Sequence, residues 1–333
     1  MTVRFGLLGA GRIGKVHARA VAGDPDAKLV AVADALETAA KELASAYAAE
    51  VRSIEEIEKA GDIDAVVICT PTDTHAELIE RFARAGKAIF CEKPIDLDVD
   101  RVERCLGVVD ETGATLMVGF NRRFDPHFAA VRKAIDDGAI GEVEMVVITS
   151  RDPGPPPYDY ITRSGGIFRD MTIHDFDMAR FLLGEEPVAV SAQASVLVDK
   201  KIGALGDYDS VSVLLRTASG KQGMISNSRR ATYGYDQRIE VHGSQGMVAA
   251  ENQRPVSIEI ANSGGFTRPP LHDFFMTRYT QAYASEIAAF VAAMSKGRKA
   301  SPSGQDGLKA LALAEAALRS VREGKTISLG DGA

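Results

Sequence analysis

The sequence predicts an α/β fold with two domains, and two patterns along the chain carry this prediction. In residues 1–120, short apolar runs alternate with segments of helical periodicity, which indicates a parallel, doubly wound sheet covered by helices. In residues 121–333, longer apolar runs are joined by tight turns, which indicates an α+β domain with a large, open, mostly antiparallel sheet. A chain of 333 residues, 45% of them hydrophobic, can bury two such cores.

In the first domain, each expected strand is an apolar run that ends at a polar or glycine-containing turn. The helices between them have recognisable ends, because Ser53 and Glu56 form a capping box and Gly86 stops the helix that starts near Thr74. The expected strands cover residues 3–8, 28–33, 65–69, 88–91 and 116–120.

The second domain is expected to contain strands joined by turns at Ser219-Gly220 and at residues 243–246. A helix over residues 307–322 closes the chain, with an apolar stripe that is most simply core packing. The expected strands cover residues 142–150, 188–198, 209–216, 222–228 and 237–242.

A glycine-rich turn separates the first expected strand from the first expected helix. It reads Gly9-Ala10-Gly11-Arg12-Ile13-Gly14, and Asp34 directly follows the second strand. In a Rossmann domain such glycines allow the tight turn, the approach of a dinucleotide pyrophosphate and close helix packing, while the acid binds the adenosine ribose. A turn that only packs two elements is the alternative, but the order of strand, turn, helix, strand and acid favours a dinucleotide. Because a 2'-phosphate would meet like charge at Asp34, the expected cofactor is NAD.

A candidate catalytic row lies near the middle of the chain. Residues 168–177 are expected to form one helix, which would place Asp170, His174 and Asp177 on a single face. A neutral imidazole beside a carboxylate can take a proton from an alcohol, so His174 is a candidate general base. The row could instead be a surface ion pair or a set of metal ligands. We expect no metal, because hydride transfer to a nicotinamide can use a protein base.

Charge and composition limit the partners. A net charge of −7 argues against a polyanion such as nucleic acid, and the longest apolar runs are too short for a membrane span. The three cysteines are few and odd in number, and the chain passes directly into its first strand, so we expect a cytoplasmic protein.

The segment Glu92-Lys93-Pro94 indicates a resemblance to one particular protein family. Together with the glycine turn, Thr70-Pro71-Thr72-Asp73-Thr74-His75 and the Asp170/His174 pair, it resembles the Gfo/Idh/MocA oxidoreductases over essentially the whole chain. Ser150-Arg151-Asp152-Pro153 and residues 164–170 are similar to stretches of the inositol-oxidising members. Thr72 departs from the asparagine that many members carry there, which puts one cofactor contact in doubt.

The resemblance implies a function and a set of roles. The expected reaction is the NAD-dependent oxidation of myo-inositol to 2-keto-myo-inositol (scyllo-inosose) by hydride transfer, in a homotetramer that acts on a small polyol. Lys93, Asp170 and His174 are the implied catalytic residues. The implied cofactor-binding residues are Gly9, Gly11, Arg12, Ile13, Gly14, Asp34, Thr70, Pro71, His75, Glu92 and Lys93. The implied substrate-binding residues are Lys93, Arg123, Asp152, Asp170, His174, Asp177 and Tyr233.

Three alternatives remain open from the sequence. The substrate could be another inositol isomer or a sugar. The fold could serve a non-catalytic NAD-sensing regulator, although that function gives no reason to keep Lys93, Asp170 and His174 together. It could also serve a glycoside hydrolase that uses NAD transiently.

Overall fold

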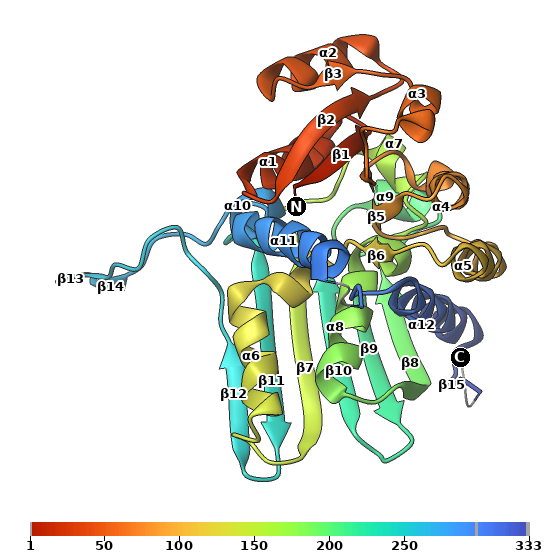
Figure 1. The fold of residues 1–333 in the computed structure, drawn as a ribbon. Coiled ribbons are helices and arrows are strands. Elements are labelled where there is room, and N and C mark those ends of the chain that lie inside the picture. Colours follow the sequence, from red (N-terminus) through yellow and green to blue (C-terminus); the bar gives the residue numbers. More distant parts are fainter. Residues whose placement is uncertain (1, 297–298, 331–333) are drawn as a thin grey trace. The chain divides into compact units, whose positions relative to one another are not determined.

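The computed structural model describes residues 2–296 and 299–330, which form two compact units (Figure 1). The first unit combines residues 1–124 with 280–311, and the second combines residues 125–279 with 312–333. The segment 280–311, which the sequence analysis placed after the domain boundary at residue 120, therefore belongs to the unit that contains the glycine turn.

The first unit is built on a six-stranded, fully parallel sheet in the order β3-β2-β1-β4-β5-β6. This order places the glycine turn after β1 in the middle of the sheet, where a doubly wound fold binds its ligand. The strands are β1 (Val3–Leu8), β2 (Ala27–Ala33), β3 (Glu50–Val51), β4 (Ala65–Ile68), β5 (Ala88–Cys91) and β6 (Leu116–Val118).

The helices of this unit begin and end where the local sequence directs. The expected capping box is present at α3, where Ser53 accepts from the N–H of Glu56 and Glu56 accepts from the N–H of Ser53. The helices are α1 (Arg12–Gly23), α2 (Glu37–Ala46), α3 (Ile54–Lys59), α4 (His75–Arg84) and α5 (Val99–Thr112), with 3-10 turns η1 (Thr72–Thr74) and η2 (Asn121–Phe124).

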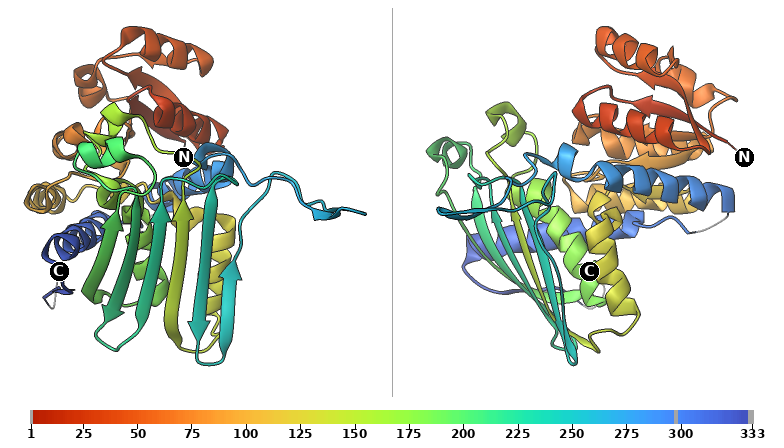
Figure 2. Two further views of the ribbon diagram at one scale, coloured as in Figure 1. Left: turned by 180° about the vertical axis from the view of Figure 1, so that it is seen from behind. Right: turned by 90° about the vertical axis from the view of Figure 1, so that its left-hand side faces the viewer.

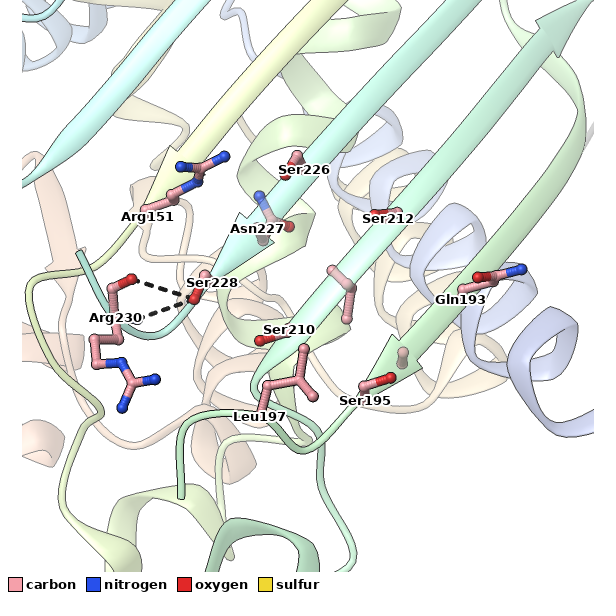
Figure 3. Close-up of a pocket in the computed structure, with 12 residues that line it drawn as sticks. Arg151, Gln193, Ser195, Leu197, Ser210, Ser212, Ser226, Asn227, Ser228 and Arg230 are labelled. Carbon is pink, nitrogen blue, oxygen red and sulfur yellow. Dashed lines mark hydrogen bonds between the residues drawn. The ribbon is translucent and has the colours of Figure 1, made fainter. Parts of the chain in front are cut away.

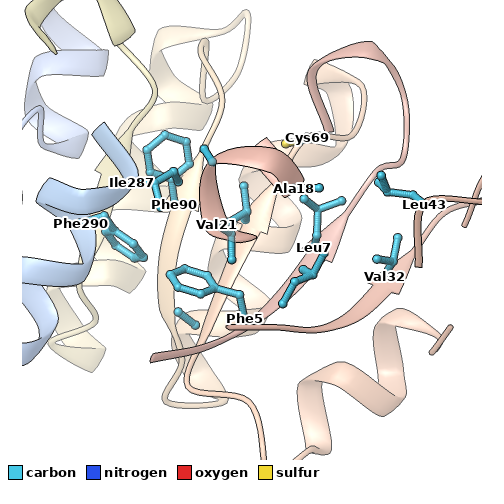
Figure 4. Close-up of a cluster of buried hydrophobic side chains, with 14 of the residues drawn as sticks. Phe5, Leu7, Ala18, Val21, Val32, Leu43, Cys69, Phe90, Ile287 and Phe290 are labelled. Atoms are coloured by element: carbon cyan, nitrogen blue, oxygen red, sulfur yellow. The ribbon is translucent and has the colours of Figure 1, made fainter. Parts of the chain in front are cut away.

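Helix α11 (Thr280–Lys296) completes the core of the first unit. Phe290 packs against Phe5 and Phe90 with ring centroids 6.1 and 5.9 Å apart, and Ile287 lies in the same cluster (Figure 4). Full burial of side chains of this size stabilises a fold by roughly 1.5–3 kcal/mol each. This burial is the physical reason why a helix from far along the chain joins the N-terminal sheet.

The second unit contains a seven-stranded sheet in the order β12-β11-β7-β10-β9-β8-β15. All neighbouring strands are antiparallel except β7 and β10, so the expected open and mostly antiparallel sheet is confirmed. The strands are β7 (Val143–Arg151), β8 (Pro187–Ser195), β9 (Ser210–Thr217), β10 (Gln222–Ser228), β11 (Asp236–Gly243), β12 (Gly246–Ala250) and β15 (Ile327–Ser328).

One face of this sheet is covered and the other is open. Helices α6 (Pro126–Asp136) and α8 (Ile173–Leu183) lie on the covered face (Figure 2). Along β9, buried and exposed residues alternate, as expected for a sheet with one solvated face. The remaining elements are η3 (Phe168–Thr172), α7 (Tyr158–Ile161), α9 (Lys200–Ala204), α10 (Phe275–Arg278), α12 (Gly304–Glu323) and the hairpin β13 (Ile260–Asn262) and β14 (Gly265–Thr267).

None of the helices in the described part of the chain combines the length and the apolar composition that crossing a bilayer requires.

Candidate functional site

The glycine turn after β1 shows why three glycines are needed. Gly9 has a φ of +97°, and a Cβ on it would lie 2.6 Å from the carbonyl oxygen of Cys69. A Cβ on Gly14 would lie 1.9 Å from the oxygen of Gly9. At Gly11, by contrast, a Cβ would meet no described atom within 4 Å, and Gly11 caps α1 without a side-chain hydrogen bond. The backbone N–H groups at the start of α1 can therefore receive an anionic group such as a pyrophosphate.

Asp34 lies beside this turn at the end of β2. Its Oδ2 accepts a hydrogen bond from the N–H of Ala10 at 2.6 Å, and its Oδ1 accepts from the N–H of Leu36 at 2.7 Å. Arg12 and Ile13 form the first turn of α1, with Arg12 exposed and Ile13 half-buried. A carboxylate, open N–H groups and a glycine turn in one place fit a dinucleotide.

His75 connects the turns that follow β4 and β5. Its Nδ1 lies 2.8 Å from the carbonyl oxygen of Pro94, and its Nε2 lies 2.8 Å from that of Thr70. The hydroxyl groups of Thr70 and Thr74 are 2.6 Å apart, and Pro71 between them is exposed. Because the His75 side chain is buried between the two turns, it can shape a cofactor site through the backbone that it holds.

Lys93 and Arg123 follow strand ends of the same unit. Lys93 is half-buried, and the preceding Glu92 turns its carboxylate towards α1, where Oε1 lies 2.6 Å from Nε2 of His17. Arg123 lies in η2 and donates from Nη2 to Asp306 Oδ1 at 2.9 Å. Asp306 is in the first turn of α12, so this ion pair joins the end of the sheet region to the start of that helix.

In the second unit, Tyr160 and Arg229 hold the carboxylate of Asp170. Tyr160 donates its hydroxyl proton to Oδ1 at 2.7 Å, and both terminal nitrogens of Arg229 lie 3.3 Å from Oδ2. The Arg229 side chain is only 1% exposed and also lies 3.8 Å from Asp207, whose pKa is raised, mainly by burial. Sequence reasoning missed Tyr160, Arg229 and Asp207, because no local pattern relates residues that far apart.

The helix that carries Asp170 is present, but its first part differs in type from an α-helix. Residues 168–172 form a π-helical turn, η3, which passes directly into α8 at Ile173, so the expected helix over residues 168–177 is confirmed as helix but is not α-helical throughout. Asp170 and His174 are partly exposed, whereas Asp177 is fully buried, with Oδ1 3.8 Å from Nη1 of Arg180. The three side chains therefore differ in their exposure to solvent. Single π-helical turns are common where a helix presents functional groups.

Asp152 and Tyr233 lie near the end of β7. Asp152 directly follows that strand, and its N–H donates to the carbonyl oxygen of Ser228 at 2.9 Å. Tyr233 is 50% exposed, donates to Asp236 Oδ2 at 2.5 Å and accepts from Arg151 Nη1 at 3.2 Å. Burial and the bond to Asp236 raise the pKa of the Tyr233 hydroxyl.

A cavity of about 350 Å³ lies on the open face of the same sheet and is lined by serines and by Arg151 and Arg230 (Figure 3). Side chains alternate across the sheet, and Ser150 bonds to Asp175 of α8 on the covered face. Arg151 points into the cavity on the other face. None of the described lining residues belongs to the predicted substrate set, but Arg151 donates to the hydroxyl of Tyr233 at 3.2 Å, so the cavity adjoins this part of the candidate site.

Comparison with known proteins identifies the family. Residues 3–120 match the oxidoreductase family with an NAD-binding Rossmann fold, and residues 128–249 match the GFO/IDH/MocA C-terminal domain. The chain belongs to the Gfo/Idh/MocA family.

Among the relatives is Inositol 2-dehydrogenase of Rhizobium meliloti (strain 1021), which is 78% identical over 99% of this chain and 100% of its own. Myo-inositol 2-dehydrogenase of Thermotoga maritima is 43% identical over 98% of both chains. The crystal structure of a myo-inositol dehydrogenase from Corynebacterium glutamicum superposes with a TM-score of 0.96 at 45% identity, covering 100% of each chain. The predicted family, two-part fold and NAD cofactor are confirmed, and the protein is an NAD-dependent dehydrogenase.

Proposed function

We propose that this protein is an inositol 2-dehydrogenase that oxidises one secondary hydroxyl of myo-inositol to give 2-keto-myo-inositol (scyllo-inosose). The observation that carries the proposal is the 78% identity over the whole chain to an enzyme named Inositol 2-dehydrogenase. Two further relatives named for myo-inositol match over nearly their whole length. Lys93, Asp170 and His174 supply the residue types that the reaction needs.

Alcohol oxidation removes a proton from oxygen and a hydride from the adjoining carbon. NAD, when bound, accepts the hydride. We assign the proton to His174, since an imidazole can accept one near neutral pH. Lys93 would stabilise the negative charge that develops on the substrate oxygen, because an ammonium group acts strongly in a site that excludes water.

Asp170 would orient the substrate hydroxyl and the imidazole. Its two oxygens are fixed by Tyr160 and Arg229, so the carboxylate is held in one orientation before substrate arrives. Such preorganisation lowers the cost of reaching the reactive geometry. This is a reason to include Tyr160 and Arg229 among the residues that support catalysis.

The remaining assignments follow the same chemistry. We propose that cationic side chains donate hydrogen bonds to the polyol hydroxyls and that carboxylate or phenol groups accept from them, because each hydroxyl can both donate and accept. This substrate set is Lys93, Arg123, Asp152, Asp170, His174, Asp177 and Tyr233. For NAD we propose Gly9, Gly11, Arg12, Ile13, Gly14, Asp34, Thr70, Pro71, His75, Glu92 and Lys93.

We further propose a homotetramer in the cytoplasm. The open face of the large sheet exposes Leu214 by 56% and Met247 by 51%, and the β13–β14 hairpin exposes Phe266 by 78%, which supports burial of this face between copies. The three cysteines are free and buried, which is compatible with a reducing compartment. Light scattering after size-exclusion chromatography measures the mass in solution, and a stable monomer would contradict the tetramer.

The test of the reaction is the absorbance of NADH as the purified enzyme meets NAD and a panel of polyols. We expect steady NADH accumulation with myo-inositol and a higher kcat/KM than with scyllo-inositol, other isomers or glucose. A higher kcat/KM with another inositol isomer or with a sugar would change the substrate assignment. No turnover with any polyol, despite NAD binding, would favour a sensing role. Hydrolysis of a glycoside without net NADH would favour a hydrolase.

A further inference from the structure

Three ionisable side chains of the first unit meet in apolar surroundings. His17 lies on α1, Glu92 at the end of β5 and Glu286 on α11, with one nitrogen or oxygen atom of each within 4.8 Å of the others. His17 and Glu286 are fully buried. The rings of Phe90 and Tyr283 pack against the imidazole at centroid distances of 5.0 and 5.5 Å. Burial of polar groups among aromatic rings is costly, so the cluster calls for a physical reason.

The position of one proton follows from the contacts. His17 Nε2 lies 2.6 Å from Glu92 Oε1, and since a carboxylate only accepts, Nε2 is the nitrogen that donates. His17 Nδ1 has no hydrogen-bond partner among the described residues, which suits the nitrogen without a proton. A Cβ at position 119 would lie 3.3 Å from the carboxyl carbon of Glu92, so Gly119 leaves room for this side chain.

Glu286 differs from the other two residues. Neither of its carboxyl oxygens has a hydrogen-bond partner within the described chain. Burial, and then the charge of Glu92, raise the pKa of Glu286 well above its ordinary value. An uncharged acid can donate its O–H to Glu92 after a rotation of the carboxyl or through one water molecule. An ionised Glu286 would instead place two carboxylates together in an apolar environment.

A metal ion is the other occupant that two carboxylates and an imidazole suggest. The 2.6 Å separation of His17 Nε2 and Glu92 Oε1 has the length of a charge-assisted hydrogen bond. Two atoms that bind one ion tetrahedrally at about 2.1 Å would lie roughly 3.4 Å apart. The distance therefore favours a proton between these two atoms.

We propose that His17 and Glu286 are positioning residues for Lys93 and act through Glu92, with His17 donating Nε2–H to the Glu92 carboxylate and Glu286 donating to it as an uncharged acid. Glu92 directly precedes Lys93, and its backbone N–H is bonded to the oxygen of Ile68 at 3.0 Å. A fixed side chain together with a fixed N–H leaves the next residue little freedom. This inference rests on the proposed function, because it acts through the role assigned to Lys93.

Two variants of equal length separate positioning from packing. Glu286→Gln keeps an uncharged donor, whereas Glu286→Met keeps the volume and removes the donor. We expect Glu286→Met to lower kcat about tenfold or more, since small displacements of a reacting group are costly, with the Kd for NAD and the KM for inositol nearly unchanged. Glu286→Gln should restore most of the turnover. Glu55→Gln on the exposed α3 is the control. Full activity of Glu286→Met, or no recovery in Glu286→Gln, would overturn the proposal.

Infrared spectroscopy gives a readout that does not depend on activity. Wild type should show the carbonyl band of a buried uncharged carboxylic acid, and Glu286→Gln should lack it. Absence of that band in wild type, or one tightly bound metal ion per chain by elemental analysis, would overturn the proposal. If wild type oxidises no polyol, the proposed function fails and the role through Lys93 fails with it, while the band still reports whether Glu286 is uncharged.

Discussion

Asp34 accepts a hydrogen bond from the backbone N–H of Ala10 at 2.6 Å, which joins the end of β2 to the glycine turn after β1. Its other oxygen accepts from the N–H of Leu36 at 2.7 Å. The carboxylate is thus held beside the turn that we assign to the pyrophosphate. A carboxylate here can accept from both ribose hydroxyls, whereas a 2'-phosphate would meet like charge.

We therefore expect kcat/KM to be at least about tenfold higher with NAD than with NADP, equivalent to roughly 1.4 kcal/mol. Combining Asp34→Ser with Ala35→Arg should narrow or reverse the preference, because it removes the repulsion and adds a cation. Initial rates with each cofactor measure the effect. Equal efficiency of wild type with both cofactors would show that Asp34 does not face the ribose.

The catalytic assignments predict loss of turnover without loss of cofactor binding. His174→Ala and Lys93→Ala should each lower kcat by about 10² or more, because a base and a charge-stabilising group act in the transition state. The Kd for NAD, measured by fluorescence titration, should change little. Lys41→Ala, on the exposed surface of α2, serves as the control and should match wild type. Near wild-type turnover of either site variant would remove its assigned role.

The fold of the first unit could be read from the sequence because its signals are local. The capping box at Ser53 spans only four residues, and it forms as expected. Gly86 follows the end of α4 with a positive φ of 71°, as expected for a glycine that stops a helix. The place of α11 could not be read this way. Its membership of the first unit depends on the packing of Phe290 against Phe5 and Phe90, which are distant in sequence.

In the candidate site, too, local features could be predicted from the sequence and long-range contacts could not. The types and order of Asp170 and His174 were visible in the sequence, but their helical geometry was not, because no local signal distinguishes the π-helical turn from the α-helix that follows. The partners of Asp170 were also hidden. Arg229 directly follows β10 and is 59 residues away, and only the tertiary fold brings it to the carboxylate.

Alanine substitutions at Gly14 and Gly11, two of the three glycines of the turn, should have different effects. In Gly14→Ala the new Cβ would clash with the Gly9 oxygen at 1.9 Å, and the nearby atom is backbone, so we expect lower thermal stability and weaker NAD binding. Gly11→Ala has free space and an ordinary φ of −69°, so its melting temperature should stay near that of wild type. Its NAD affinity should nevertheless fall about tenfold or more, because the methyl group occupies the approach to the pyrophosphate. Thermal melts and NAD titration of both variants test these two predictions. An unchanged affinity of Gly11→Ala for NAD would show that the pyrophosphate does not bind at this turn.

Glu286 predicts how stability depends on pH. Burial, followed by the charge of Glu92, raises its pKa well above the ordinary value in the folded protein. The unfolded chain releases this proton above a pKa of about 4.3, so folding takes up a proton at any pH between the unfolded and the folded pKa. The folded state binds more protons than the unfolded state in this range, and the free energy of unfolding therefore falls as pH rises from the unfolded pKa towards the folded pKa. Below the unfolded pKa this loss is absent.

Glu286→Gln has no proton to take up, so its stability relative to wild type should increase with pH. The difference in unfolding free energy should grow by up to about 1.4 kcal/mol per pH unit as the pH rises from the unfolded pKa of about 4.3 towards the folded pKa. The other titratable groups that face Glu286 are His17 from α1, Glu92 from β5 and Cys69 after β4, and the pKa of Cys69 is itself raised by burial, so this thiol stays protonated over the range. Urea unfolding midpoints of both proteins at several pH values measure the difference, with Glu55→Gln as an exposed control. A difference that stays constant with pH would show that Glu286 is ionised in the folded protein.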